Sequence, residues 1–232
     1  MAGGRHTRGR ASSLRPGTPR GELARFDESR ERQADETRQR ILEAMLATCG
    51  DKGYRRVAVQ DVIEAYGGNR VQFYHLFSSK ADCYAAAHED GIERLQARVL
   101  GAAAAETGWR QALRAGLAEI AATAEEHPLV ARGLLVEVQV AGGPALRRHA
   151  EVRNRFVAAL DAARREPGPR PSPPPITAQF MAGAVESTLT AALAAGEPAA
   201  FTAAVPELTH MIVSAYLGED AATEELEATR AA

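Results

Sequence analysis

The stretch VQDVIEAYGGNRVQFYHLF, residues 59–77, is the feature that most constrains the fold of this chain. Its first apolar residues recur at the spacing of one face of a short helix of about two turns. Gly67 and Gly68 then allow a tight turn, because glycine accepts a positive φ without steric cost. Asn69 follows at a position suited to cap another short helix over 70–77. Two short helices joined by a glycine-containing turn predict a helix-turn-helix motif.

The second of these helices has two unlike faces. At about 100° per residue, Phe73, Leu76 and Phe77 fall on one side, which predicts that they enter the core. Val71 and His75 point the opposite way, with Gln72 and Tyr74 on the flanks. The outward face is either an ordinary solvated helix face or a surface that binds a partner.

An outward face of this composition suits the major groove of a DNA duplex, which is wide enough to admit a helix. Arg70 can reach a guanine edge, Gln72 can pair with adenine, and Val71 can pack on a thymine methyl group. Tyr74 and His75 are placed to bond phosphates, which fix the register of a protein on DNA. The candidate DNA-binding residues are Arg56, Gln60, Asn69, Arg70, Val71, Gln72, Tyr74, His75 and Lys80.

The distribution of charge favours the same interpretation. Residues 1–80 hold fifteen Lys and Arg against ten Asp and Glu, whereas residues 81–232 hold thirteen against twenty. A basic front and an acidic back indicate that only the front part meets a polyanion.

The rest of the chain predicts an all-α protein of about nine helices, because Ala and Leu dominate and β-branched runs are scarce. Three regions are expected. A basic, disordered tail covers 1–35, where the five arginines of the first 21 residues could form a phosphate-binding arm or an inert extension. A DNA-binding domain covers 36–95, with the motif at about 58–77. A larger helical domain covers 96–232, with a mobile Pro-rich loop at 166–175.

No catalytic or metal-binding set stands out, so the chain is not expected to be an enzyme or to hold a cofactor. The histidines lack HExxH spacing, and the fragment His88-Glu89-Asp90 has no second cluster of metal ligands. Cys49 and Cys83 fall inside helical apolar patterns and are expected to be buried free thiols of a cytoplasmic protein. No apolar run approaches the ~18 residues that a membrane span needs.

With these residues in place, the chain resembles the TetR family of bacterial transcriptional regulators. RILEAMLATCGDKGY resembles the first helix of that family, and VQDVIEAYGGNRVQFYHLFSSKADCYAAAHED resembles its next two helices and the start of the fourth. The most specific part is FYHLFSSKADCY, with an aromatic pair, a terminal Phe77 and Lys80. Val57-Ala58 stand where the family usually has a capping Ser or Thr, and Gly68 replaces an apolar turn residue, which is expected to loosen the motif.

The resemblance implies a homodimer, formed by the last two helices at roughly 176–217, that reads a palindromic operator. It also implies a small-molecule effector, expected to be largely apolar, bound within the larger helical domain. The candidate pocket residues are Trp109, His127, Glu137, Gln139, Phe180 and Met181. Glu137 interrupts an apolar run, so it needs a ligand or a partner, for which an arginine is the ordinary choice.

The functional prediction is a ligand-responsive transcriptional regulator, a repressor in the usual manner of this family, with no membrane association. The alternative is a helical small-molecule or lipid-binding protein that has kept the fold with little or no DNA binding. A third hypothesis is a regulator that binds a partner protein through its Pro-rich loop.

Overall fold

Helix α1 begins earlier than the sequence predicts. The computed structural model describes residues 19–165 and 173–230, and α1 runs from Pro19 to Lys52. The predicted boundary between tail and ordered chain, at residue 35, therefore lies inside this helix. The predicted tail residues 1–18 and most of the Pro-rich loop, 166–172, lie outside the described residues.

The described residues are mainly helical, which confirms the predicted all-α class. They contain no strand. In chain order the helices are α1 (Pro19–Lys52), α2 (Val59–Tyr66), α3 (Arg70–Leu76), α4 (Lys80–Ala104), α5 (Trp109–Glu126), α6 (Pro128–Leu135), α7 (Val138–Ala141), α8 (Gly143–Asp161), the 3-10 turn η1 (Ala162–Arg165), α9 (Thr177–Ala195), α10 (Pro198–Leu217) and α11 (Glu219–Arg230).

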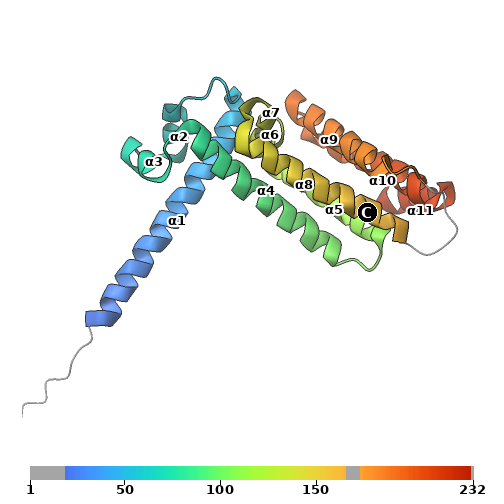
Figure 1. Ribbon diagram of the computed structural model, residues 1–232, viewed down its shortest axis with the longest axis horizontal. Helices are drawn as coiled ribbons and strands as arrows, with labels where there is room; N and C mark the ends of the chain where they lie inside the picture. Colours follow the sequence, from blue (N-terminus) through green and yellow to red (C-terminus); the bar gives the residue numbers. More distant parts are fainter. Residues whose placement is uncertain (1–18, 166–172, 231–232) are drawn as a thin grey trace, which may run out of the picture. The chain divides into compact units, whose positions relative to one another are not determined.

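The chain forms two compact units, Met1–Thr37 and Arg38–Ala232. The described part of the first unit is the N-terminal half of α1, where the Thr37 hydroxyl donates a 2.8 Å hydrogen bond to the Gln33 carbonyl. In the second unit, α4 packs against α5 and α8, α9 packs against α8 and α10, and α10 contacts α5 and α11 (Figure 1). The result is a small helix-turn-helix region followed by a larger helical bundle.

The predicted apolar stripe of α1 is confirmed. Ile41, Leu42, Met45 and Leu46 are completely buried, as is Cys49 one turn later. Both cysteines are free and buried, and burial raises the pKa of the Cys49 thiol to about 12.

Helices α1 and α6 lie so close together that only glycine fits at their crossing. A Cβ atom on Gly50 would lie 1.9 Å from the carbonyl oxygen of Leu129, and one on Gly133 would lie 2.0 Å from the carbonyl oxygen of Leu46. Real Cβ atoms do not approach a carbonyl this closely, so a side chain at either position would push the helices apart. The backbone of α6 is thus seated directly on the first helix of the helix-turn-helix region.

Two features near the C-terminus differ from the sequence-based expectation. Pro206, which predicts a kink or a late start, lies inside α10, and that helix begins at Pro198. Helix α11 is not predicted by the sequence pattern. No single helix among the described residues is both long and apolar enough to cross a membrane, although the pair Pro128–Ala141 and Gly143–Arg165, bent by 118°, has the length and composition.

Candidate functional site

The turn between α2 and α3 is held by backbone and side-chain hydrogen bonds. Gly67 ends α2 with a φ of 70°, a conformation that favours glycine, and its N–H bonds back to the Ile63 carbonyl at 3.1 Å. Asn69 and Gln72 then form a reciprocal capping box. The Gln72 N–H donates to Asn69 Oδ1 at 3.0 Å, and the Asn69 N–H donates to Gln72 Oε1 at 3.1 Å. The predicted role of Asn69 as a helix cap is confirmed.

Gly68 leaves room in this turn for the ring of Tyr66, and the expected loosening of the motif stays a prediction. A Cβ atom at Gly68 would lie 1.9 Å from the ring of Tyr66, so the tyrosine ring fills the space that a side chain would take. The Tyr66 hydroxyl donates a 2.7 Å hydrogen bond to the Asn69 carbonyl, across the turn. The guanidinium of Arg40, on α1, donates to the Tyr66 carbonyl and ties the turn to the first helix.

Helix α3 presents the predicted residues outward. Val71 is 80% exposed and Tyr74 46% exposed, whereas Phe73 is completely buried and Phe77, directly after the helix, is 4% exposed. Arg70, Gln72 and His75 are also exposed. The Arg70 guanidinium lies 5.5 Å from the centre of the Tyr74 ring, a cation–π contact that orders an otherwise mobile side chain. The outward face predicted from the helical wheel is thus present, while its contacts with DNA stay a prediction.

The start of α2 lacks a side-chain cap but has a substitute for it. Ala58 offers no capping oxygen, and the carboxylate of Asp61 instead accepts a 2.7 Å bond from the Ala58 N–H. Asp61 also pairs with Lys52 at 2.7 Å, and these two interactions lower the pKa of its carboxyl. The predicted DNA contacts here, Arg56 and Gln60, are exposed; Arg56 Nε donates to the Lys52 carbonyl at 2.7 Å and Gln60 donates to Glu64 at 3.0 Å.

Lys80 is the member of the predicted set whose side chain makes three contacts inside the chain. Its ammonium donates to the carbonyls of Tyr54 at 2.9 Å and Val57 at 3.0 Å, and it lies 4.4 Å from the centre of the Tyr54 ring. An ammonium has three N–H donors, so these bonds leave one for a phosphate. The main role of Lys80 in the folded chain is therefore to hold the turn between α1 and α2.

Glu137 is the buried carboxylate that the sequence singled out, and its partner is a backbone N–H. It is 8% exposed and accepts a 2.7 Å hydrogen bond from the Tyr54 N–H. The sequence-based expectation of an arginine partner is therefore wrong. Glu137 stands between α6 and α7, so this bond joins the larger helical region to the turn that precedes α2.

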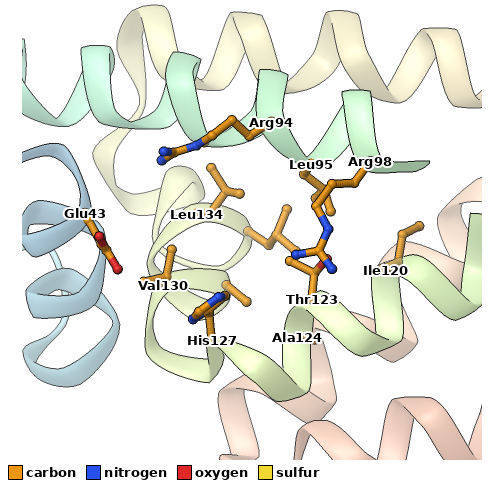
Figure 2. Close-up of a pocket in the computed structure, with 13 residues that line it drawn as sticks. Glu43, Arg94, Leu95, Arg98, Ile120, Thr123, Ala124, His127, Val130 and Leu134 are labelled. Carbon is orange, nitrogen blue, oxygen red and sulfur yellow. The ribbon is translucent and has the colours of Figure 1, made fainter. Parts of the chain in front are cut away.

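The six predicted pocket residues do not share one cavity. Trp109 lines a cavity of about 220 Å³ between α4, α5 and α8. His127 lines a neighbouring cavity of about 250 Å³ bounded by α1, α4, α5 and α6, which Figure 2 shows. Gln139 is exposed, Phe180 is 68% exposed, and Met181 borders an open groove beside it. Only the first two therefore lie at sites able to enclose a small molecule.

A buried histidine pair went unnoticed in the sequence. His88 is completely buried with neither ring nitrogen hydrogen-bonded, and its ring centre lies 5.7 Å from that of His149. His149 Nε2 pairs with Glu186 at 3.1 Å. Glu89, beside His88, points to solvent, and no group of three or more metal-ligating side chains occurs in the described ranges. A spacing of 61 residues between the two histidines gives no local signal.

The fold and the outward face of α3 together define a helix-turn-helix DNA-binding protein. Residues 41–87 match the family model described as bacterial regulatory proteins of the tetR family. The helix-turn-helix region is therefore similar, over those residues, to the bacterial regulators of this family. A search of curated protein sequences returned no match.

Several solved structures share the fold of this chain at low sequence identity. The transcriptional regulator FadR from Bacillus subtilis, in complex with stearoyl-CoA, has a TM-score of 0.66 at 13% identity, over 76% of this chain and 97% of its own. A TetR family regulator from Marinobacter aquaeolei VT8 has 0.59 at 18% identity, over 75% and 96%. A gamma-butyrolactone receptor, an ArpA-like protein, has 0.64 at 17% identity, over 86% and 97%.

Proposed function

We propose that the protein is a transcriptional repressor that binds a palindromic operator as a homodimer and releases it when a small-molecule effector binds. The observation that carries the proposal is the exposed face of α3, where Arg70, Val71, Gln72 and Tyr74 face outward from a helix anchored by Phe73. A face with one arginine, one amide and one apolar group offers contacts for three kinds of base edge. Tyr74, His75 and Arg56 supply contacts with phosphates beside it.

Dimerisation is proposed through α9 and α10. Ile176 is 65% exposed, Phe180 68% and Met211 51%. A monomer would leave these large apolar side chains in water, and apolar groups of this kind on neighbouring helices are typical of an interface. A two-fold dimer would place its α3 helices in half-sites about one helical turn, ~34–36 Å, apart.

An effector is proposed for two reasons. The larger helical region contains the two cavities between α4, α5, α6 and α8. The similar structures include a regulator with bound stearoyl-CoA and a gamma-butyrolactone receptor, so this fold accommodates small organic molecules. Helix α4 lines both cavities and also carries Lys80, which holds the turn before α2. An effector that moves α4 would therefore move the DNA-binding helices as well.

The test is a footprint and a mobility-shift titration on DNA flanking the gene for this protein, over a series of salt concentrations. We expect a protected, roughly palindromic site, and a binding constant whose logarithm falls linearly with the logarithm of the salt concentration. Arg70→Ala should weaken binding and relax the preference at one base position. Arg147→Ala, an exposed arginine on α8, is the matched control and should bind like the parent.

The second candidate function is a small-molecule or lipid-binding protein without DNA binding, and the apolar cavity beside Trp109 favours it. The test for this function combines a ligand-binding assay with a DNA-binding assay at low salt on genomic fragments selected without bias. Ligand binding without sequence-dependent DNA binding would establish this function and refute the proposal of a repressor.

A further inference from the structure

Arg70 differs from two other arginines of the helix-turn-helix region. The guanidinium of Arg40 donates to the Tyr66 carbonyl. Arg56 Nε donates to the Lys52 carbonyl at 2.7 Å. Arg70 is exposed, and in the described part of the chain its guanidinium has no hydrogen bond and no ion pair. The five N–H donors of this guanidinium are therefore all free to bind a partner from outside the chain.

The contact that the structure gives for the Arg70 guanidinium is with an aromatic ring. The guanidinium lies 5.5 Å from the centre of the Tyr74 ring. Tyr74 follows four residues later on α3, and residues at this spacing are neighbours on the surface of a helix. A cation over an aromatic face is attracted by the negative charge of the π system. This attraction orients Arg70 without a hydrogen-bond acceptor.

The ring of Tyr74 is itself held by the core. Its centre lies 5.4 Å from the centre of the Phe73 ring, in an edge-on arrangement with an interplanar angle of 82°. Phe73 is completely buried, and its ring centre lies 5.8 Å from that of Phe77. The half-exposed ring of Tyr74 therefore contacts the buried phenylalanine as well as the exposed Arg70, and the contact with Phe73 restrains its movement.

The backbone of Arg70 is fixed as well. Arg70 is the first residue of α3, and the capping box between Asn69 and Gln72 encloses it. An arginine side chain has many rotamers, and restricting them on binding costs entropy. Where the free protein already restrains the side chain, that cost is smaller and binding is tighter. A guanidinium restrained in this way can donate two parallel hydrogen bonds to the O6 and N7 atoms of a guanine.

We propose that Tyr74 is a positioning residue for Arg70: its ring holds the guanidinium on the outward face of α3, and the preference for guanine at one operator position depends on that ring. The hydroxyl of Tyr74 takes no part in this preference and binds a phosphate, which is the same at every base pair. The inference rests on the proposed function, because it states how one residue of the proposed DNA-binding face is prepared for its base. Tyr74 thereby determines specificity in addition to its expected contact with the DNA backbone.

The first test measures base preference on the site that the footprint protects. Each guanine of the site is replaced in both half-sites together, and the ratio of the two dissociation constants gives the preference at that position. Arg70→Ala identifies the position that Arg70 reads, because the ratio falls toward one there. Tyr74→Leu should lower the same ratio at least fivefold, because one cation–π contact is lost in each half-site. Tyr74→Phe keeps a ring and should stay within about twofold of the parent ratio, with a lower affinity for all sites.

His75→Leu is the matched control. His75 is also exposed on α3, and in the described residues it has no hydrogen bond, ion pair or ring contact with Arg70. This variant should bind all sites more weakly and leave the ratio at the Arg70 position unchanged. A fall in that ratio as large as in Tyr74→Leu would show general damage to α3 and overturn the inference. Thermal unfolding checks each variant, and Tyr74→Met provides a second protein without the ring if Tyr74→Leu does not fold.

The second test needs no DNA. NMR order parameters of the arginine Nε–H groups report how strongly each guanidinium is restrained in the free protein. The reference is Arg55, an exposed arginine whose side chain has no hydrogen bond, ion pair or ring contact in the part of the chain that the structure describes. We expect Arg70 to be more ordered than Arg55 in the parent and in Tyr74→Phe, and to fall to the Arg55 value in Tyr74→Leu. An Arg70 as mobile as Arg55 in the parent would overturn the inference.

The two tests distinguish a failure of this inference from a failure of the proposed function. Sequence-specific DNA binding with an unchanged ratio in Tyr74→Leu would refute the positioning role and leave the repressor intact, as would an Arg70→Ala protein in which no ratio changes. A parent that binds no DNA sequence specifically would refute the repressor and the role of Tyr74 in base preference together. The order parameters would then still decide whether the ring restrains Arg70.

Discussion

The carboxylate of Glu137 accepts a 2.7 Å hydrogen bond from the backbone N–H of Tyr54, a residue 83 positions earlier. Lys80 donates to the carbonyl of the same Tyr54, and the ring of Tyr84 packs edge-on against the Tyr54 ring at 4.9 Å. Tyr54, at the turn before α2, is thus held at its N–H by Glu137, and at its carbonyl and its ring by two side chains from the start of α4. This turn and the crossing of α1 with α6 are therefore two contacts that connect the DNA-binding helices to the helical bundle.

Replacing Glu137 should weaken the link between the larger helical region and the turn before α2. Glu137→Ala leaves the Tyr54 N–H without its partner and should lower the free energy of unfolding by about 1–3 kcal/mol. Glu137→Gln keeps an acceptor oxygen and should cost less. Denaturant unfolding measures both, with Gln139→Ala, an exposed neighbour, as the control. Equal stability of Glu137→Ala and the control would show that the hydrogen bond contributes nothing.

Gly68→Ala should destabilise the helix-turn-helix by about 1–3 kcal/mol, the cost of forcing an extra carbon into a packed site. The obstacle is the ring of Tyr66, so the loss should shrink in a Tyr66→Leu background. A double-mutant cycle by thermal or denaturant unfolding gives the coupling between the two positions. Additive effects would mean that the ring does not set the size limit at residue 68.

Gln72 caps α3 together with Asn69 and is also a proposed DNA contact, and two substitutions distinguish these roles. Gln72→Glu keeps the acceptor that caps the Asn69 N–H but removes the amide donor and adds a negative charge next to DNA. It should fold like the parent and lose DNA affinity at least tenfold. Gln72→Ala also loses the reciprocal cap, at a cost of about 0.5–2 kcal/mol to the helix. Mobility shifts and unfolding curves on both variants check this, and undiminished DNA binding by Gln72→Glu would remove Gln72 from the reading face.

His88 should make stability depend on pH. Burial, followed by the nearby His149 and Arg148, lowers the pKa of His88 from 6.5 to about 4. Because the unfolded chain then binds more protons between these two values, the stability that His88 contributes is complete above pH 6.5 and is lost as pH falls toward 4.

His88→Phe removes this titration. The fall in unfolding free energy between pH 6.5 and 4 should be smaller in the variant than in the parent, by up to about 3 kcal/mol. Urea unfolding at several pH values measures the difference, and subtracting the two proteins cancels the titration of carboxyls such as Glu186. Parallel curves for the two proteins would contradict the assignment.

Phe180→Asp should shift the proposed homodimer to monomer, because it places a charge where an exposed ring would meet the partner. Leu100→Asp is the control, since Leu100 on α4 is also exposed, at 54%. Sedimentation velocity across a concentration range measures the mass of each. A Phe180→Asp protein that keeps the mass of the parent would move the interface away from α9.

The local sequence pattern predicts the helix-turn-helix well because its features are set by residues close together in the chain. The bounds of α2 and α3, the cap at Asn69 and the exposure of Val71 and Tyr74 depend on helical periodicity and on residues within four positions of one another. The size limit at Gly68 comes from the ring of Tyr66, and a sequence pattern does not predict the rotamer of a neighbouring side chain. The six pocket candidates share only suitable residue types. Residue type does not predict which helices lie side by side, so it does not predict which of these residues line one cavity.

The sequence by itself determined an all-helical chain with a short helix whose aromatic residues are buried on one side and whose polar residues face outward on the other. Helical periodicity determines those features, because the spacing of residues along a helix decides which face each side chain occupies. Only the tertiary structure decided that Glu137 holds Tyr54, that α6 rests on α1 through two glycines, and that Arg98 is paired with Glu119 and Glu126. These are contacts between segments tens of residues apart, and packing alone brings such segments together.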